Sequence, residues 1–336
     1  MSWPGHLHLH YRSTAGSHGP RTIAHDRHDG PLRVLQALYP ESPAVCHHVL
    51  VHPPGGIVGG DELQIDVELQ PGAHALITTP GATRFYRSAG PLATQFARLR
   101  IGANARLEWL PLETLVHDGC RARNTLHLDL ADGASMIGWD ILALGLPASA
   151  QPLTSGCFEQ HIDWPARWLE QTRLDFEDPA QAGLTRRLLA SPLGWSGRSV
   201  LATAWCAARP AWNTPITEAL TEDAREALST HLHTGLHASP HASMPTSKPG
   251  PAPAALTNTT AAALPRAGTR ADASAACVSA SQTPAWGVTS PHPGLVVARL
   301  LAHRTEAVWP ALQALRAAWR QRLWSLPDVR PRVWRT

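Results

Sequence analysis

Hydrophobic and polar residues alternate strictly over residues 61–69, which is the period of a β-strand with one buried face. The apolar positions are Leu63, Ile65, Val67 and Leu69. A Pro-Gly turn follows at residues 70–73, and residues 74–79 continue as a short apolar segment that runs into a second Pro-Gly turn. This pattern predicts a β-hairpin.

The same unit recurs further along the chain. Residues 99–103 and 128–134 repeat an apolar-x-apolar segment that leads into a Gly-Ala turn. The turn glycines are spaced by 30 and 31 residues, at Gly72, Gly102 and Gly133. Such a regular period predicts a mainly all-β fold with layered, helicoid-like stacked β-hairpins. A β-sandwich whose hairpins have similar lengths remains the alternative.

Beyond Gly145 the alternation weakens. We expect strands at residues 168–176 and 199–205, with a short helix between them at residues 182–189. Near the C-terminus, apolar residues recur at steps of three and four at Val308, Leu312, Leu315, Trp319 and Leu323. This spacing predicts an amphipathic helix, which more often covers a core than binds a partner, and Pro327 ends it.

Composition divides the chain into three parts. Residues 236–285 are dominated by Ala, Pro, Ser and Thr and hold too little apolar surface to offset chain entropy, so we expect a disordered insert. Residues 1–235 are expected to form a β-rich core. Residues 286–336, which include the amphipathic helix, are expected to complete the same domain.

Bulk charge and residue usage exclude several functions. The 336 residues carry a formal charge of only +3 without a basic run, which argues against nucleic-acid binding. The single lysine, Lys248, lies in the insert, which argues against lysine-based chemistry. The five cysteines form no C-x-x-C pair, the first residues show no basic region that leads into an apolar stretch, and no long apolar run occurs. We therefore expect a protein of the reducing cytoplasm that does not enter a membrane.

The densest group of turn-forming residues is the sequence HPPGGIVGGD at residues 52–61. Its prolines fix an extended backbone, and its glycines permit positive φ or close backbone approach. The loop-shaping residues are Pro53, Pro54, Gly55, Gly56, Gly59 and Gly60. The loop precedes a strand, so it lacks the helix N-terminus of a phosphate site, and no nucleotide-binding P-loop sequence occurs elsewhere. We expect no nucleotide hydrolysis.

Several sequence blocks resemble the UreD (UreH) family of urease accessory proteins. PPGGIVGGD is followed by an alternating strand and then by TTPGATRFYRS at residues 78–88, as in that family. Further blocks at residues 30–34, 107–114, 138–142 and 331–336 keep the family's order. The chain departs from the family pattern at Leu146, where an arginine is common, and at Gln151, where a glutamate is common.

The resemblance implies a non-catalytic scaffold or metallochaperone that is required for urease maturation. It implies a second accessory subunit (UreF type), a GTPase (UreG type) and apo-urease as partners. Nickel would be handled transiently, without a tightly bound cofactor. Two alternatives remain: a structural adaptor that never contacts nickel, and a carbohydrate-active enzyme on a β-repeat that uses Glu108 and Glu113. Without further support, those glutamates are expected at the surface or in turns.

Two groups of residues offer metal-ligand chemistry. Cys46, His47 and His48 supply thiol and imidazole, although neighbours on a strand point to opposite faces. The alternative is a buried Cys46 beside two solvent-facing histidines. Near the N-terminus, His6, His8 and His10 alternate with leucines and therefore share one strand face. They form either a metal-binding face or an ordinary solvated one.

Two carboxylates complete the candidates. Asp140 lies within an apolar run, and a carboxylate there must be paired, protonated or bound to a cation. Asp61 ends the glycine-rich loop. The resemblance implies an internal nickel route, in which we place Asp61, Asp140, Cys46 and His47. For Asp61 the alternative is a structural carboxylate that accepts hydrogen bonds from turn amides.

Overall fold

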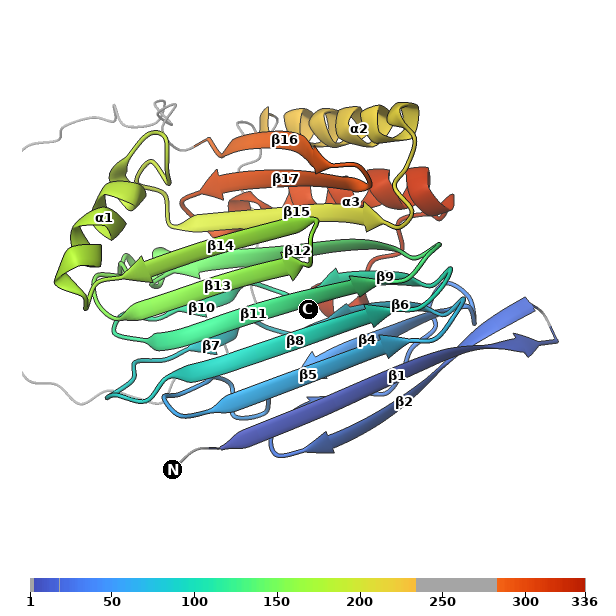
Figure 1. Ribbon diagram of the computed structural model, residues 1–336, viewed down its shortest axis with the longest axis horizontal. Helices are drawn as coiled ribbons and strands as arrows, with labels where there is room; N and C mark the ends of the chain where they lie inside the picture. Colours follow the sequence, from blue (N-terminus) through green and yellow to red (C-terminus); the bar gives the residue numbers. More distant parts are fainter. Residues whose placement is uncertain (1–2, 18, 234–282, 336) are drawn as a thin grey trace, which may run out of the picture.

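The computed structural model describes residues 3–17, 19–233 and 283–335 as two stacked β-sheets flanked by helices (Figure 1). The first sheet has the spatial order β14 (Trp168–Asp175), β13 (Cys157–Trp164), β11 (Arg121–Leu130), β8 (Ala93–Ile101), β5 (Glu62–Leu69), β1 (Pro4–Gly16) and β2 (Gly19–Asp29). The second has the order β16 (Ala285–His292), β17 (Leu295–Ala302), β15 (Val200–Ala208), β12 (Ser135–Leu144), β9 (Arg106–Leu110), β6 (His74–Thr78), β4 (Val45–Val51) and β3 (Arg33–Val34).

Shorter elements complete the fold. Two short strands, β7 (Thr83–Phe85) and β10 (Thr114–Val116), join the second sheet beside β12. The α-helices of the described residues are α1 (Pro179–Ala190), α2 (Thr214–His233) and α3 (Trp309–Trp324). Short 3-10 helices lie at Pro147–Ser149, Thr305–Ala307 and Arg332–Arg335. In Figure 1, α2 and α3 lie at the β16 end of the second sheet, and α1 lies on the opposite side of the view.

The chain alternates between the two sheets as it advances. Strand β5 pairs in parallel with β1 and β8, whereas β6 pairs in parallel with β4 and β9 in the other sheet. The predicted mainly all-β, layered, helicoid-like fold is confirmed, but the predicted hairpin pairing of β5 with β6 is wrong. Each unit is a β-arch, a strand-turn-strand whose strands lie in different sheets. Alternation and a Pro-Gly turn are common to both motifs, so local sequence does not separate them.

The predicted repeat corresponds to one coil of this solenoid. Leu69 pairs with Ile101, and Ile101 pairs with Leu130 on the next coil, all in parallel register. A sandwich of hairpins requires antiparallel neighbours, so the sandwich alternative is excluded for these coils. Stacked parallel strands bury each other's apolar faces, which explains why the period in the sequence is so regular.

Burial follows the predicted alternation on the first sheet. Leu63, Ile65 and Val67 are buried between the sheets, whereas Glu62 and Gln64 face solvent. The second sheet is covered on both faces, by the first sheet and by α2 and α3. Its strand β12 is accordingly almost continuously apolar. The molecule therefore has two adjoining cores, one on each side of the second sheet.

The other predicted elements are also found. The strands predicted at residues 168–176 and 199–205 correspond to β14 and β15, and the predicted short helix lies within α1. The C-terminal amphipathic helix is α3, and its buried residues include Leu312, Leu315 and Trp319. Helix α2 was not predicted, although it buries apolar residues at four-residue steps, at Leu220, Ala224, Leu228 and Leu232.

Most of the predicted insert, residues 236–282, falls within a stretch outside the described residues. Strand β16 begins at Ala285, and β17 pairs antiparallel with β15. The chain on both sides of this stretch therefore contributes to one sheet. Among the residues that the structure describes, no helix combines the length and hydropathy needed to cross a bilayer.

Candidate functional site

The glycine-rich loop packs directly against the TRFYRS block that follows it in the sequence. The backbone N–H of Tyr86 donates to the carbonyl of Ile57 at 2.9 Å. A Cβ atom on Gly56 would lie 2.0 Å from the Tyr86 ring, and one on Gly59 would lie 2.0 Å from Ser88 Oγ. No side chain fits at such distances, so these glycines allow the two blocks to form one wall.

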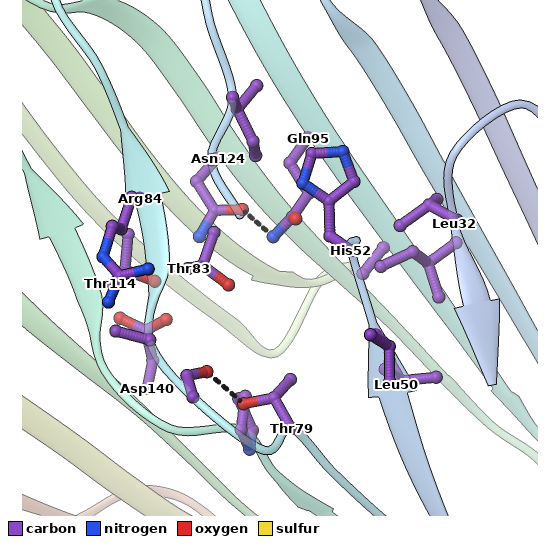
Figure 2. A pocket seen from close by; sticks show the side chains of 18 of the residues that line it. Leu32, Leu50, His52, Thr79, Thr83, Arg84, Gln95, Thr114, Asn124 and Asp140 are labelled. Carbon is purple, nitrogen blue, oxygen red and sulfur yellow. Dashed lines mark hydrogen bonds between the residues drawn. The ribbon is translucent and has the colours of Figure 1, made fainter. Parts of the chain in front are cut away.

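A cavity of about 230 Å³ lies between the sheets beside this wall (Figure 2). Both sheets and the loop contribute to its lining. Its polar lining side chains include His52, Thr79, Thr83, Arg84, Gln95, Thr114, Asn124, Thr125 and Asp140. Apolar residues of both sheets, such as Ile65 and Trp109, supply the rest of the lining. The cavity is thus a largely apolar chamber with a few polar groups at defined positions.

Asp140 on β12 is the one carboxylate among the cavity-lining residues. The side chain keeps some accessible surface because it lines the cavity, yet it lies deep within the protein. Burial raises the pKa of Asp140 to about 7, the nearby charge of Glu170 adds to the effect, and a hydrogen bond with Gln160 offsets part of it. None of the ion pairs found among the described residues includes Asp140. It is therefore a buried acid without a cationic partner.

His52 lies at the loop end of the cavity. Burial lowers the pKa of His52, and the negative charge of Asp61 offsets part of that shift. The imidazole is therefore neutral near pH 7 and has a nitrogen lone pair for a metal or a hydrogen-bond donor. Sequence reasoning missed His52 as a candidate, although its place directly before the first loop proline was a usable signal.

The residues around Cys46 do not converge on one point. On β4, Cys46 and His48 face the core between the sheets, where the Tyr11 hydroxyl lies 2.8 Å from His48 Nδ1. His47 faces the other way, and its Nε2 lies 2.7 Å from Glu41 Oε1. The expectation of solvent-facing histidines is wrong, because His47 is 4% and His48 3% exposed. The second sheet is covered on both faces, so neither side of β4 meets water.

Asp61 also lies outside the cavity lining. Its Oδ2 accepts a hydrogen bond from the backbone N–H of Val58 at 2.9 Å, and its own N–H donates to the Val58 carbonyl at 3.0 Å. The geometry is that of a carboxylate that closes a turn. Its electrostatic effect on His52 is its link to the cavity.

The N-terminal histidines share one face of β1, as their alternation predicts. His6 Nε2 lies 2.8 Å from Asp66 Oδ2, and His8 Nε2 lies 3.8 Å from Glu68 Oε2, on the outer face of the first sheet. His10 is on the same face. Over the described ranges, no group of three or more His, Cys, Asp or Glu residues is arranged to hold a metal ion. The role of these histidines in metal binding stays a prediction.

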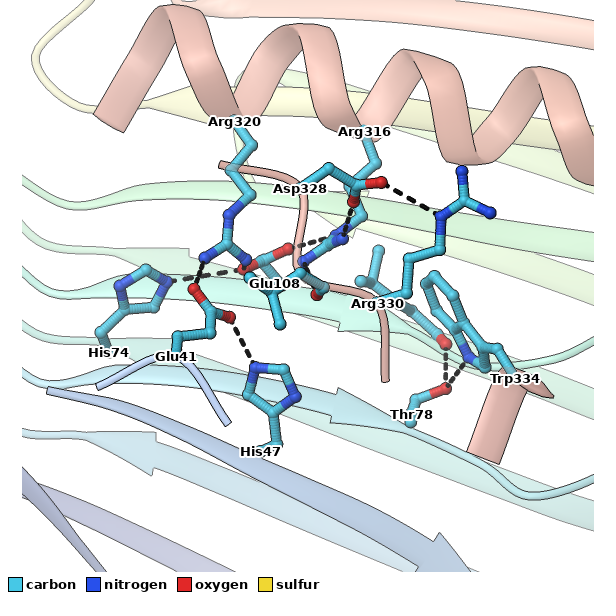
Figure 3. A network of polar contacts seen from close by, with 12 residues as sticks. Glu41, His47, His74, Thr78, Glu108, Arg316, Arg320, Asp328, Arg330 and Trp334 are labelled. Carbon is cyan, nitrogen blue, oxygen red and sulfur yellow. Dashed lines mark hydrogen bonds and ion pairs between the residues drawn. The ribbon is translucent and has the colours of Figure 1, made fainter. Parts of the chain in front are cut away.

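Glu108 lies in a buried network of charges beneath α3 (Figure 3). Arg316 Nε donates to its carboxylate at 2.5 Å and Arg320 Nη1 at 2.6 Å. Arg320 also pairs with Glu41, and Arg316 with Asp328. The expectation of a surface or turn position for Glu108 is wrong, since it is 0% exposed. Both its oxygens are occupied by arginines, which disfavours a role as a general acid or base.

The C-terminal sequence block packs against the same sheet. Trp334 Nε1 donates to Thr78 Oγ1 at 3.0 Å, and the Trp334 ring lies 5.4 Å from that of Trp139 and 5.6 Å from that of Trp309. The departures from the family pattern fall in a tight loop. Leu146 and Gln151 are joined there by reciprocal backbone hydrogen bonds of 2.7 and 3.2 Å.

These features define a class of protein: a parallel two-sheet β-solenoid with an interior chamber that contains an unpaired carboxylate. The family model described as UreD urease accessory protein matches residues 4–335. Over the full length of both chains, the sequence is 48% identical to a urease accessory protein UreD of Methylibium petroleiphilum and 47% identical to that of Leptothrix cholodnii. The chain therefore belongs to the UreD family of urease accessory proteins, and it takes part in urease maturation.

Proposed function

We propose that this protein is a non-catalytic scaffold that docks on apo-urease and helps to insert nickel into the enzyme. It acts in the cytoplasm together with a second accessory subunit (UreF type) and a GTPase (UreG type). Family membership supports the role in maturation. The observation that supports contact with nickel is Asp140, a buried carboxylate without an ion-pair partner on the wall of an interior cavity.

The donor groups of the cavity suit a metal that must be released again. Nickel accepts imidazole nitrogen and carboxylate oxygen, and the cavity provides one of each, at His52 and Asp140. Six water molecules occupy roughly 180 Å³ at liquid density, so a hydrated divalent cation fits the chamber. One carboxylate without a preformed ligand cage favours transient binding, as a transfer protein requires.

The sequence agrees with a separate GTPase that hydrolyses the nucleotide. The glycine-rich loop forms a wall against Tyr86 and Ser88 and leads into strand β5, where a phosphate site would need a helix N-terminus. Nucleotide hydrolysis is therefore assigned to a partner. Nickel remains a transient cargo in this proposal.

Co-purification and gene deletion test the scaffold role. Tagged protein is expected to bring down apo-urease and the second accessory subunit, and deletion of its gene is expected to abolish most urease activity at limiting nickel. Normal urease activity in the deletion strain would overturn the proposal. A structural adaptor that never contacts nickel gives the same two results, so variants of Asp140 are needed to separate the two roles.

A further inference from the structure

A groove of about 430 Å³ lies beside α1 and shares no lining residue with the interior cavity. The end of β12, the loop that follows it, α1 and the segment between α1 and β15 contribute to its lining. Its floor includes the buried residues Leu144 and Leu153, whereas Pro152, Arg186 and Gly197 at its rim are exposed. Further apolar lining comes from Phe176, Leu189 and Ala190. The groove is therefore an apolar surface that is open to solvent.

The charged residues that line this groove are two arginines, Arg186 and Arg198, without an acid. No ion pair found among the described residues includes either of them. The Arg186 guanidinium lies 5.9 Å from the centroid of the Phe176 ring. Arg198 Nη2 donates to the Thr283 carbonyl at 3.3 Å, and Arg198 Nε is buried without an acceptor in the described part of the chain. Two positive charges thus lie beside an apolar surface without a countercharge.

Elsewhere in the molecule, arginines pair with carboxylates through two parallel hydrogen bonds. Arg322 Nε and Nη2 donate to the two oxygens of Asp223 at 2.8 and 2.9 Å. The planar fork of a guanidinium matches a carboxylate, and such charge-assisted pairs are stronger than neutral hydrogen bonds. The groove provides the arginine half of this pairing twice, next to apolar side chains. It therefore suits a ligand in which carboxylates lie beside apolar groups.

The open shape of the groove favours a polypeptide over a small molecule. A binding pocket typically covers about 70–90% of the surface of a small ligand, which a groove open to solvent does not do. A segment of a protein partner needs cover on one side only, because the rest of the partner covers the other. Exposed apolar surface with a polar rim is also typical of protein-protein contacts.

We propose that the groove beside α1 binds a segment of a partner protein in which acidic side chains lie next to apolar ones. The carboxylates of this segment pair with Arg186 and Arg198, and its apolar side chains cover Leu153, Phe176 and Leu189. This role goes beyond the proposed function, since it needs neither nickel nor contact at Asp140. The partner is defined by its acidic and apolar character alone.

Fluorescence anisotropy with a labelled peptide tests this role on the full chain. The probe alternates leucine with glutamate and is acetylated and amidated at its ends, so that its charges are those of its side chains. The same peptide with glutamine in place of glutamate is expected to bind at least about tenfold more weakly, because it lacks charge-assisted hydrogen bonds. Binding of the glutamate peptide is expected to weaken as the salt concentration rises.

Substitution of the two arginines is expected to remove this preference. Arg186→Met and Arg198→Met keep an apolar stem but remove the charge, and each is expected to weaken binding of the glutamate peptide about tenfold. Arg167→Met is the matched control, because the Arg167 guanidinium also lies over an aromatic ring, 5.2 Å from that of Trp164 at the other end of β13. Its affinity is expected to equal that of the parent protein. Arg186 is exposed, so Arg186→Met decides the test if Arg198→Met fails to fold.

The outcomes separate a protein partner from other occupants. Equal affinity for the glutamate and glutamine peptides, or parent-level affinity in Arg186→Met, would overturn the proposal. Hexanoate that binds as tightly as the peptide would assign the groove to small carboxylates instead. Self-association of the chain that is lost in Arg186→Met, measured by sedimentation, would assign it to a second copy. Neither of these two assignments is compatible with the proposed partner, and none of the outcomes bears on nickel contact at Asp140.

Discussion

Two buried carboxylates lie on neighbouring strands of the second sheet and have opposite environments. Glu108 on β9 faces α3, where the charges of two arginines surround it. Asp140 on β12 faces the cavity, and none of the ion pairs found among the described residues includes it. Burial alone would raise the pKa of Glu108, but Arg316, His74 and Arg320 outweigh it and hold that pKa well below its ordinary value.

The difference separates a carboxylate that stabilises the fold through ion pairs from one that has no countercharge and is proposed to bind nickel. The Glu108 network joins α3 and the C-terminal segment to the sheet. Both carboxylate oxygens of Glu108 are paired with arginines and are not free to bind a ligand. Asp140 carries the cost of burial without a countercharge, which is typical of a residue kept for binding. The predictions below test this contrast.

The largest effect is expected at Glu108. Glu108→Gln keeps the shape but leaves Arg316 and Arg320 with one buried carboxylate charge fewer, which is expected to lower the free energy of unfolding by about 3–5 kcal/mol. Chemical denaturation at pH 7 measures it. Glu113→Gln, at the end of the same sequence block, is expected to change stability by less than about 0.5 kcal/mol. Equal effects in the two variants would contradict the structural role of the network.

Asp140→Asn is expected to raise the free energy of unfolding, whereas Glu108→Gln lowers it. The pKa of this carboxyl rises from 3.8 to about 7 on folding, so the folded state binds more protons and loses stability as pH rises through this window. The variant is expected to be more stable than the parent by about 2–4 kcal/mol at pH 8 and to match it at pH 4. Thermal or chemical denaturation at both pH values measures this.

Asp118 provides the control for the direction of this pH-dependent change in stability. It is desolvated slightly, but hydrogen bonds from Thr154 and Ser155 dominate and lower its pKa. Asp118→Asn is therefore expected to destabilise the protein at pH 8 and to have less effect as pH falls below about 4. If Asp140→Asn also destabilises at pH 8, Asp140 is paired in solution, and the contrast with Glu108 fails.

Among the residues that line the cavity, a glycine packed against a side chain should tolerate less change than one with open space beside it. Gly56→Ala would place Cβ 2.0 Å from the Tyr86 ring and is expected to lower the free energy of unfolding by about 1–3 kcal/mol. At Gly81, where an added Cβ would have no heavy atom within 4 Å, the same change is expected to be nearly neutral. Comparable melting temperatures for the two variants would show that the wall is not closely packed.

The smallest effect is expected on the outer face of the first sheet. His6→Gln, His8→Gln and His10→Gln remove imidazoles that are partly exposed. His6 faces the buried carboxylate of Asp66, and His8 faces the partly exposed carboxylate of Glu68. His8→Gln and His10→Gln are each expected to change stability by less than about 0.5 kcal/mol, because exposed ion pairs contribute little. His6→Gln alters a hydrogen bond to a buried carboxylate and is expected to cost up to about 1 kcal/mol. Urease maturation is expected to be unaffected. Loss of maturation in the triple variant would assign the metal-handling role to this face instead of the cavity.

Local sequence predicted the elements better than their pairing. The alternation at Leu63, Ile65 and Val67 correctly placed a half-buried strand, and the period of the turn glycines correctly indicated stacked units. Whether β6 pairs with β5 or with β9 depends on contacts between coils. Those contacts involve residues far apart in the sequence, so the hairpin was predicted where an arch exists.

The site shows the same limit. Asp140 stood out because a carboxylate in an apolar run needs an explanation, and the structure places it on the cavity wall. Gln95 and Asn124 lie far apart in the sequence, and only the strand register places them side by side on the cavity wall. Glu108 was misjudged because its arginine partners are more than 200 residues away along the chain.

The central claim is that Asp140 contacts nickel on its way to urease. The most direct measurement is the nickel content per active site of urease matured with Asp140→Ala, at limiting nickel, in complexes shown to assemble normally. We predict a loss of about tenfold or more relative to the parent protein. Full nickel occupancy in urease matured by the assembled Asp140→Ala variant would contradict the claim and favour an adaptor that never contacts the metal.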